Sequence, residues 1–392
     1  HMNLYHNLSI STRIQPIPKL TTSFEEYPHS SELSYEERVE IFYQHSKPKT
    51  FRAAVNIDPE NPFFSFAMGL MDISRKEIRK GIRVSIANDP AIDAGGPIRA
   101  VFLSIAKEMQ DGKVSHFKSY DNHTVYFNPL AEDNPEIFHA FGRMVGIAIL
   151  QGINFPANFS LTIFKLILGQ PISFQDYEAL DRTDVESIRQ ICEMDPDHIE
   201  SMYLSFSATY QVNEKTSKIS LVPGGDEIDV TKANLTEYLR TLVLHRLGSH
   251  LPLKSFVIGV QEVVPRDKLS IFSPQMLQLL VNGTQNFSVA DLQKDSSASN
   301  VDPTKLAWLW ECLEEMNDED RALFLTFVTG TSVLPASGLD PPMKISSTSG
   351  KFPVAHTCFN ALELPNYDTK DNLKANILFS IRNSEAMGFG MV

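Results

Sequence analysis

Apolar residues recur at helical spacing along most of the chain. Behind Pro97, a residue tolerated in the first turn of a helix, the positions Ile98, Val101, Phe102 and Ile105 repeat every three or four residues. This is the pattern of a helix that buries one face. The same reasoning predicts helices over residues 137–150, 159–168, 185–194, 234–247, 304–316, 318–328 and 370–383.

The first 34 residues break this pattern. They are polar, carry three prolines and have few periodic apolar positions, so they predict a leader ahead of the first packed element. Ser34 can cap a helix over residues 34–44. Glu36 and Glu37 follow in its first turn, where acidic side chains are favourable to the helix dipole.

Strands are predicted only in short runs. Residues 202–210 and 218–222 alternate like two strands joined by a polar turn, and residues 223–226 form a further turn by composition. Short strands and loops are expected after residue 333. Residues 285–303 are the most polar stretch of the second half and predict a linker. The fold class expected is therefore α+β, with a large, mostly helical lobe, a linker and a small mixed lobe.

Charge and cysteine content narrow the function. The chain has 35 basic and 48 acidic residues, a formal net charge of −13, which argues against nucleic-acid binding. No apolar run approaches the roughly 18 residues of a membrane span. The three cysteines are widely spaced and make no disulfide framework, so a reducing compartment is expected, cytoplasmic or nuclear.

Of these cysteines, Cys192 and Cys312 lie in apolar helical patterns and are expected in the core. Cys358 differs, because prolines flank its segment and His356 stands two residues away. A nearby histidine can lower a thiol pKa and make the thiolate nucleophilic, although such residues are more often structural. Zinc is disfavoured, because no second ligand pair lies near and no C-x-x-C occurs. No cofactor loop is present either.

Residues 356–367, HTCFNALELPNY, closely resemble the active-cysteine segment of HECT-type ubiquitin ligases. Further blocks resemble that family in the same order, over about residues 35–392. They are Asp93-x-Gly95-Gly96-x-x-Arg99, Phe141-Gly142-Arg143-x-Val145-Gly146, Pro223-Gly224-Gly225 with Val230-Thr231-x-x-Asn234, Phe324-Leu325-x-Phe327-Val328-Thr329-Gly330-Thr331, and the ending Gly388-Phe389-Gly390-Met391-Val392.

The resemblance implies a bilobal fold and a two-step reaction. We expect a leader over residues 1–34, an N-lobe over 35–295, a hinge over 296–303 and a C-lobe over 304–392. A small subdomain, about residues 150–235, would bind the conjugating enzyme. Ubiquitin would pass from that enzyme to a ligase cysteine as a thioester, and then to a lysine of a protein substrate.

The resemblance also assigns the site residues. Cys358 is the implied ubiquitin acceptor. His356 is either a general base or a residue that orients the loop. Thr357 would fix the loop or contact the bound tail, Glu363 is a candidate acid–base helper, and Phe389 would anchor the tail during transfer to lysine.

A groove for the conjugating enzyme is implied in the small subdomain, although apolar residues at such spacings are usually core. Matching segment by segment gives Ile188, Ile191, Met194, Met202, Leu204, Tyr238 and Leu242.

Two other functions stay open. One is a non-catalytic module that binds ubiquitin or a conjugating enzyme, which the intact Cys358 segment argues against. The other is a cysteine hydrolase, for which no distant His and Asp or Asn pattern is visible.

Overall fold

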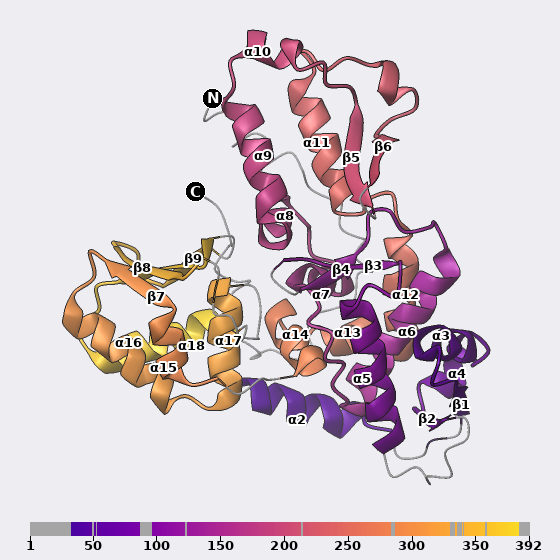
Figure 1. Ribbon diagram of the computed structural model, residues 1–392. Helices are drawn as coiled ribbons and strands as arrows, with labels where there is room; N and C mark the ends of the chain where they lie inside the picture. Colours follow the sequence, from indigo (N-terminus) through magenta and orange to yellow (C-terminus); the bar gives the residue numbers. More distant parts are fainter. Residues whose placement is uncertain are drawn as a thin grey trace.

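The computed structural model describes residues 33–48, 51, 53–86, 96–121, 124–212, 215–283, 287–329, 334, 339, 341–356 and 359–383. The leader predicted over residues 1–34 therefore lies almost wholly outside the described residues. Figure 1 shows three units, defined below by their elements. Helix and mixed small sheets make this an α+β fold, as the sequence predicts.

The first described helix, α2 (Tyr35–Ser46), begins at the predicted cap. Ser34 Oγ accepts from the Glu37 amide at 3.2 Å, and the Glu37 carboxylate accepts from the Ser34 amide at 2.6 Å. This reciprocal capping box satisfies two amides that the helix leaves without partners. The Phe42 ring packs edge-on against Phe272 at 5.3 Å, which fixes α2 to the large unit.

The large unit is built around two helices that cross closely, α6 (Pro135–Gln151) and α12 (Leu253–Val263). A Cβ atom on Gly142 would lie 2.0 Å from the Phe256 carbonyl oxygen, and one on Gly259 would lie 2.1 Å from the His139 carbonyl oxygen. Only glycine allows the two backbones to come this close. Beside the crossing, the Phe141 and Phe256 rings stack at 5.2 Å.

A buried guanidinium ties this crossing to its surroundings. Arg143 Nη2 lies 2.6 Å from the Glu262 carboxylate, and Arg143 Nη1 donates to the carbonyls of Leu70 and Ile73. Leu70 lies in the last turn of α3 (Pro62–Met71) and Ile73 just beyond its end, so one side chain links three helices. Burial opposes the change, but the hydrogen bonds from Arg143 lower the pKa of Glu262, which keeps the pair charged.

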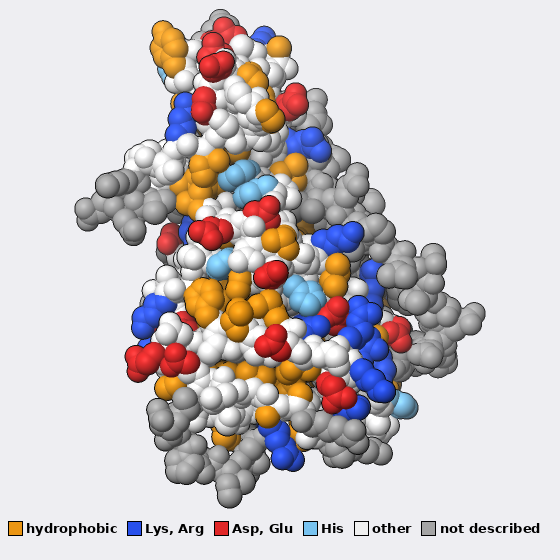
Figure 2. Space-filling view, turned by 90° about the vertical axis from the view of Figure 1, so that its right-hand side faces the viewer, with side chains coloured by type: hydrophobic (Ala, Val, Ile, Leu, Met, Phe, Trp, Pro, Cys, Tyr) orange, Lys and Arg blue, Asp and Glu red, His pale blue; other side chains and the backbone are white. Residues whose placement is uncertain are grey.

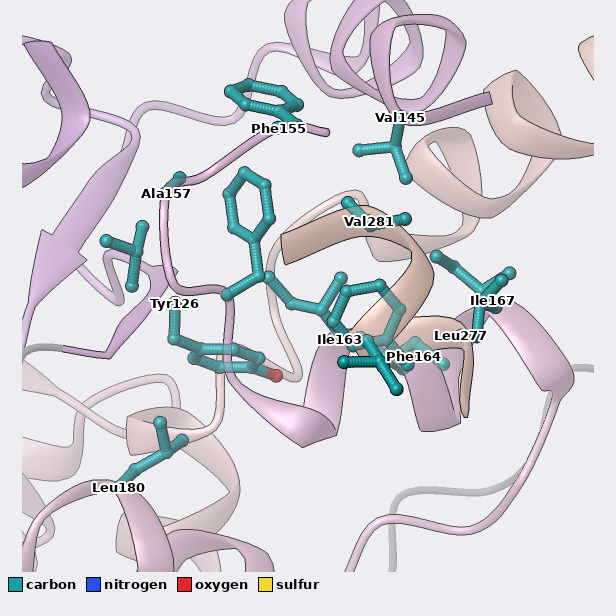
Figure 3. Close-up of a cluster of buried hydrophobic side chains, with 14 of the residues drawn as sticks. Tyr126, Val145, Phe155, Ala157, Ile163, Phe164, Ile167, Leu180, Leu277 and Val281 are labelled. Atoms are coloured by element: carbon teal, nitrogen blue, oxygen red, sulfur yellow. The ribbon is translucent and has the colours of Figure 1, made fainter. Parts of the chain in front are cut away.

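The remaining elements of the large unit surround this crossing. They are β1 (Ala53–Ile57) paired in parallel with β2 (Ile82–Ile86), α4 (Arg75–Ile78), α5 (Gly96–Gln110), β3 (Phe117–Ser119) paired with β4 (Val125–Phe127), α7 (Leu161–Leu168), α13 (Arg266–Leu269) and α14 (Pro274–Asn282). The predicted stripe on α5 is buried as expected. Figure 3 shows the cluster where Ile163 and Ile167 of α7 meet Leu277 and Val281 of α14.

The small unit projects from the large one and forms the tapered end of the molecule (Figures 1 and 2). It contains α8 (Phe174–Leu180), α9 (Arg182–Glu193), α10 (Pro196–Ser201), β5 (Ser207–Val212), β6 (Lys215–Ser220), the 3-10 helix η3 (Gly225–Glu227) and α11 (Leu235–Arg246).

The two strands predicted in this unit are present, but at shifted positions. The paired residues are 207–212 and 215–220 rather than 202–210 and 218–222. Tyr203 has a left-handed backbone, with φ of 50°, which interrupts the extended chain before β5. The predicted turn is confirmed: Gly224 has φ of 69°, and a Cβ on Gly225 would lie 2.3 Å from the Phe206 carbonyl oxygen.

The C-terminal unit contains α15 (Val289–Lys294), β7 (Ser296–Ser299), α16 (Pro303–Glu315), α17 (Asp318–Thr329), β8 (Met343–Thr348), β9 (Val354–His356), β10 (Ala361–Pro365) and α18 (Lys370–Arg382). The strand order is β7-β8-β10-β9. The pairs β7–β8 and β8–β10 are parallel, and β9 is antiparallel to β10.

The hinge predicted over residues 296–303 overlaps the first strand in the order of this sheet. Ser296–Ser299 form edge strand β7, which pairs with residues 343–346 of β8. Its side chains are mostly exposed, so backbone hydrogen bonds rather than apolar burial hold it in place. A strand of this kind leaves no hydrophobic signal in the sequence.

The C-terminal unit rests on the large unit through α17, which contacts α14. The Asn317 side chain also donates to the Glu36 carboxylate of α2 at 2.9 Å. No helix in the described ranges is both long and apolar enough to cross a membrane.

We expect Gly142→Ala to lower the free energy of unfolding by about 3 kcal/mol or more, because the added methyl group meets a backbone carbonyl that cannot rotate away. Urea unfolding followed by circular dichroism measures this. Gly350→Ala is the matched control, since its nearest neighbour would lie at 3.7 Å, and its effect should stay within about 0.5 kcal/mol. Equal effects of the two variants would contradict the close crossing.

Candidate functional site

His356 and Glu363 lie next to each other on adjacent strands. His356 ends β9 and Glu363 lies in the middle of β10, with His356 Nε2 3.3 Å from Glu363 Oε1. Both side chains are substantially exposed, at 48% and 38%. The carboxylate can therefore orient the imidazole, and both groups remain open to solvent.

The segment after the candidate nucleophile is anchored by Asn360. This residue has a left-handed backbone with φ of 48°, and its side-chain amide donates to the Pro341 carbonyl at 2.8 Å. Its own carbonyl accepts from the Lys344 amide at 2.8 Å, at the start of β8. Asparagine adopts this conformation more readily than most other side chains, and the Asn360 amide bonds a carbonyl 19 residues earlier in the chain.

Three of the predicted site residues, Thr357, Cys358 and Phe389, lie outside the described residues. The residues on either side of Thr357 and Cys358 are described. Thr357 and Cys358 fall between His356 and Phe359, and Phe389 follows α18. Arg382 near the end of α18 makes two hydrogen bonds to Asp320 of α17, at 3.2 and 2.8 Å, which fixes the last described turn.

Phe359 was not singled out from the sequence, yet it makes a contact between units. Its ring lies 5.7 Å from the guanidinium carbon of Arg182 and 5.5 Å from that of Arg189, both on α9 of the small unit. These distances suit cation–π attraction. Nothing in the sequence joins residues about 170 positions apart, so only the fold reveals this contact.

The predicted groove residues divide into two groups by burial. Ile188, Tyr238 and Leu242 are buried in the small unit, where the Tyr238 ring meets Phe206 edge-on at 5.5 Å. The others retain exposed surface: Ile191, Met194 and Leu204 are half-buried and Met202 is exposed.

Two exposed apolar side chains near Met202 were missed. Tyr203 is 90% exposed, and Ile228 is exposed on the neighbouring segment, which pairs with residues 204–206 through backbone hydrogen bonds. The run Met202-Tyr203-Leu204 was the available signal, because three consecutive large apolar residues cannot all face one core.

Metal chemistry finds no support among the side chains described. Within those residues, no group of three or more His, Cys, Asp or Glu side chains could hold an ion.

The comparisons with known proteins decide the family. Residues 103–391 match the family model for the HECT domain, described as a ubiquitin transferase. The chain belongs to the HECT-domain family.

Curated relatives agree with this. The chain is 28% identical over 364 residues to the E3 ubiquitin-protein ligase pub3 of Schizosaccharomyces pombe, covering 88% of this chain and 46% of that protein. It is 30% identical over 340 residues to pub1 of the same organism (82% and 44%) and 27% identical over 355 residues to RSP5 of Saccharomyces cerevisiae (86% and 43%). The chain spans less than half the length of these relatives.

In this HECT domain, a polar network fixes the base of the small unit. Arg246 Nη2 donates to the Thr209 carbonyl at 3.0 Å, and its guanidinium lies 4.1 Å from the centre of the Tyr210 ring. Tyr210 Oη is 2.6 Å from His245 Nδ1, and the His245 ring stacks on His250 at 4.0 Å. Figure 2 shows histidine side chains near the level where the molecule narrows.

The chain of contacts continues into the large unit. His250 Nε2 lies 2.9 Å from the Pro129 carbonyl, in the segment that follows β4. The network thus runs from β5 and α11 to the large unit and determines how the small unit sits on it.

We expect the His245–His250 pair to make this junction sensitive to acid. Burial, the neighbouring His250 and the Arg246 guanidinium lower the pKa of His245 to about 4, against 6.5 in the unfolded chain. The unfolded state therefore binds the proton first, and stability present above pH 6.5 is lost as the pH falls toward 4.

His245→Gln should flatten the fall in unfolding free energy between pH 7 and pH 4.5, measured by urea unfolding at several pH values. His198→Gln, which alters an exposed histidine, is the control and should keep the wild-type slope. An unchanged slope in His245→Gln would show that His245 is not the partly buried neutral group described.

Proposed function

We propose that this chain is the catalytic domain of a ubiquitin-protein ligase. It accepts ubiquitin from a ubiquitin-conjugating enzyme as a thioester on Cys358 and transfers it to a lysine of a protein substrate. The observation that carries the proposal is the HECT family match over residues 103–391, which includes the Cys358 segment. The framing of that segment by β9, β10 and Asn360 supports it.

The chemistry requires a sulfur nucleophile and a proton acceptor. The Cys358 thiolate attacks the thioester carbonyl carried by the conjugating enzyme, a new carbon–sulfur bond forms, and the enzyme's own thiolate leaves. Such exchange is nearly balanced in energy. The substrate amine then attacks the new thioester, loses a proton, and releases the Cys358 thiolate. We propose His356, oriented by Glu363, as the acceptor of that proton.

We propose a bilobal arrangement in which the C-terminal unit moves relative to the other two. The boundary we assign is the connection between α14 and α15, upstream of the region predicted from sequence, because β7 belongs to the C-terminal sheet. Gly283 at the end of α14 has φ of 80° and ψ of −179°, a conformation available essentially to glycine alone. A hinge at Gly283 would allow one unit to turn on the other.

The conjugating enzyme is proposed to dock on the small unit. Ile191, Met194, Met202 and Leu204 carry the accessible apolar surface, while Ile188, Tyr238 and Leu242 support it from the core. Adaptable Met side chains suit such a docking surface. Ubiquitin and protein substrates complete the set of partners, and we propose action in the cytoplasm or nucleus, since the cysteine usage suits a reducing compartment.

Wild-type protein mixed with activating enzyme, conjugating enzyme, ATP and ubiquitin should form an adduct that reductant removes. Cys358→Ala should abolish this adduct, because the nucleophile is lost. Cys358→Ser should give an adduct that resists reductant, because an oxygen ester replaces the thioester. Gels run with and without reductant measure all three. A reductant-sensitive adduct that persists in Cys358→Ala would assign the nucleophile elsewhere.

The rival function, a binding module without catalysis, predicts a different result. The folded wild-type protein would bind a loaded conjugating enzyme and form no adduct with any member of a broad panel.

Docking and core residues of the small unit should respond differently to truncation. Met202→Ala should weaken conjugating-enzyme binding about fivefold while changing stability by less than about 0.5 kcal/mol, because the side chain is exposed. Ile188→Ala should lower stability by about 2–5 kcal/mol, because its side chain is 98% buried. Calorimetric binding and urea unfolding distinguish the two. Unchanged binding in Met202→Ala would move the docking surface elsewhere.

A further inference from the structure

Arg182 and Arg189 lie on the same side of helix α9. Seven residues make almost two full turns, so their side chains project one above the other. Both guanidinium groups lie within 6 Å of the centre of the Phe359 ring, which comes from the C-terminal unit. Phe359 is about one third exposed, and the two arginines cover part of the remaining surface of its side chain.

The two flanks of α9 serve different neighbours. Val185, Ile188 and Cys192 form the stripe buried in the small unit. At 100° per residue, Arg182 and Arg189 border one edge of this stripe and Ile191 borders the other. The arginine flank faces Phe359, and the Ile191 flank belongs to the surface proposed for the conjugating enzyme.

Both sides of the Phe359 contact are held in place. Arg189 lies 2.8 Å from the Glu186 carboxylate and 3.3 Å from that of Glu178, which is itself buried. Phe359 is followed by Asn360, which is bonded to the Pro341 carbonyl. A contact between two such fixed parts constrains the units more than a contact between loose side chains would.

We propose that Phe359, held by Arg182 and Arg189, is a latch that keeps the segment of Phe359 and Asn360 beside α9 for the step in which Cys358 receives ubiquitin. The latch rests on the proposed function. Phe359 and the arginines are positioning residues, because they act through the placement of the segment. The latch shortens the path from a conjugating enzyme docked on the opposite flank of α9, and proximity of this kind raises the rate of group transfer. The later step to lysine does not require it.

The contact itself is tested without any enzymatic reaction. Spin labels on Ser187→Cys of α9 and Lys344→Cys of β8, both exposed positions, are placed in the Cys358→Ser background. Pulsed electron spin resonance should give one dominant distance for the otherwise unaltered chain. Phe359→Ala should broaden the distribution.

A matched control is available in the same unit. Phe379 is 38% exposed and stacks on Phe352 at 5.3 Å, so Phe379→Ala should keep the narrow distribution. An unchanged distribution in Phe359→Ala would overturn the latch.

The role in transfer is tested by single-turnover kinetics from a loaded conjugating enzyme. Phe359→Ala should slow thioester formation about fivefold, the loss expected for removing two exposed cation–π contacts. Arg182→Gln should slow it less, Arg182→Lys should restore most of the rate, and Arg182→Gln should add little to Phe359→Ala. Phe359→Trp, which keeps an aromatic face, should remain near the wild-type rate.

Two readouts separate positioning from damage to the nucleophile. Alkylation of Cys358 by iodoacetamide and discharge of a preformed thioester to free lysine should both stay within about twofold of wild type in Phe359→Ala. If Phe359→Ala forms the thioester at the wild-type rate, the latch is contradicted but the proposed function is not. A wild-type protein that forms no adduct would contradict the proposed function, while the distance measurement would still report on the contact.

Discussion

The structure depends on the close crossing of α6 and α12. Gly142 and Gly259 have no Cβ atoms, and this brings each backbone against a carbonyl of the other helix. At that separation the Arg143 guanidinium reaches Glu262 together with carbonyls at the end of α3 and just beyond it. The aromatic core, in which the Phe141 and Phe256 rings stack, then fills the space on the other side. One larger residue at the crossing would move every element that these contacts hold.

From this core, two arms of contacts extend toward the candidate site. One passes through α14 to α17, which also contacts β9 and β10, the strands that carry His356 and Glu363. The other passes through Pro129 and the stacked histidines to Arg246, whose ion pair with Asp184 reaches α9 of the small unit. The two arms meet where Phe359 lies against the arginines of α9. The residue beside Cys358 is thus supported by units folded from distant parts of the chain.

Local features of this fold could be predicted from sequence, and contacts between units could not. Ser34 caps α2 and the stripe behind Pro97 is buried, because capping and helical periodicity involve only neighbouring residues. Strand β7 was not predicted from the sequence, since an exposed edge strand carries no apolar alternation. The Cys358 segment was found through its resemblance to the HECT family, whereas its isolated Cys–His signal left a structural role open. The Phe359 contact needs the tertiary structure, because nothing local relates it to α9.

The central claim is that ubiquitin becomes covalently attached to Cys358 before it reaches lysine. Intact mass spectrometry within seconds of mixing with a loaded conjugating enzyme tests this directly. The account predicts a mass gain of one ubiquitin on this chain, removed by thiol and located by proteolysis to the peptide containing Cys358. Ubiquitin appearing on substrate lysines, with no thiol-sensitive gain on this chain at any time, would show direct transfer from the conjugating enzyme and would contradict the account.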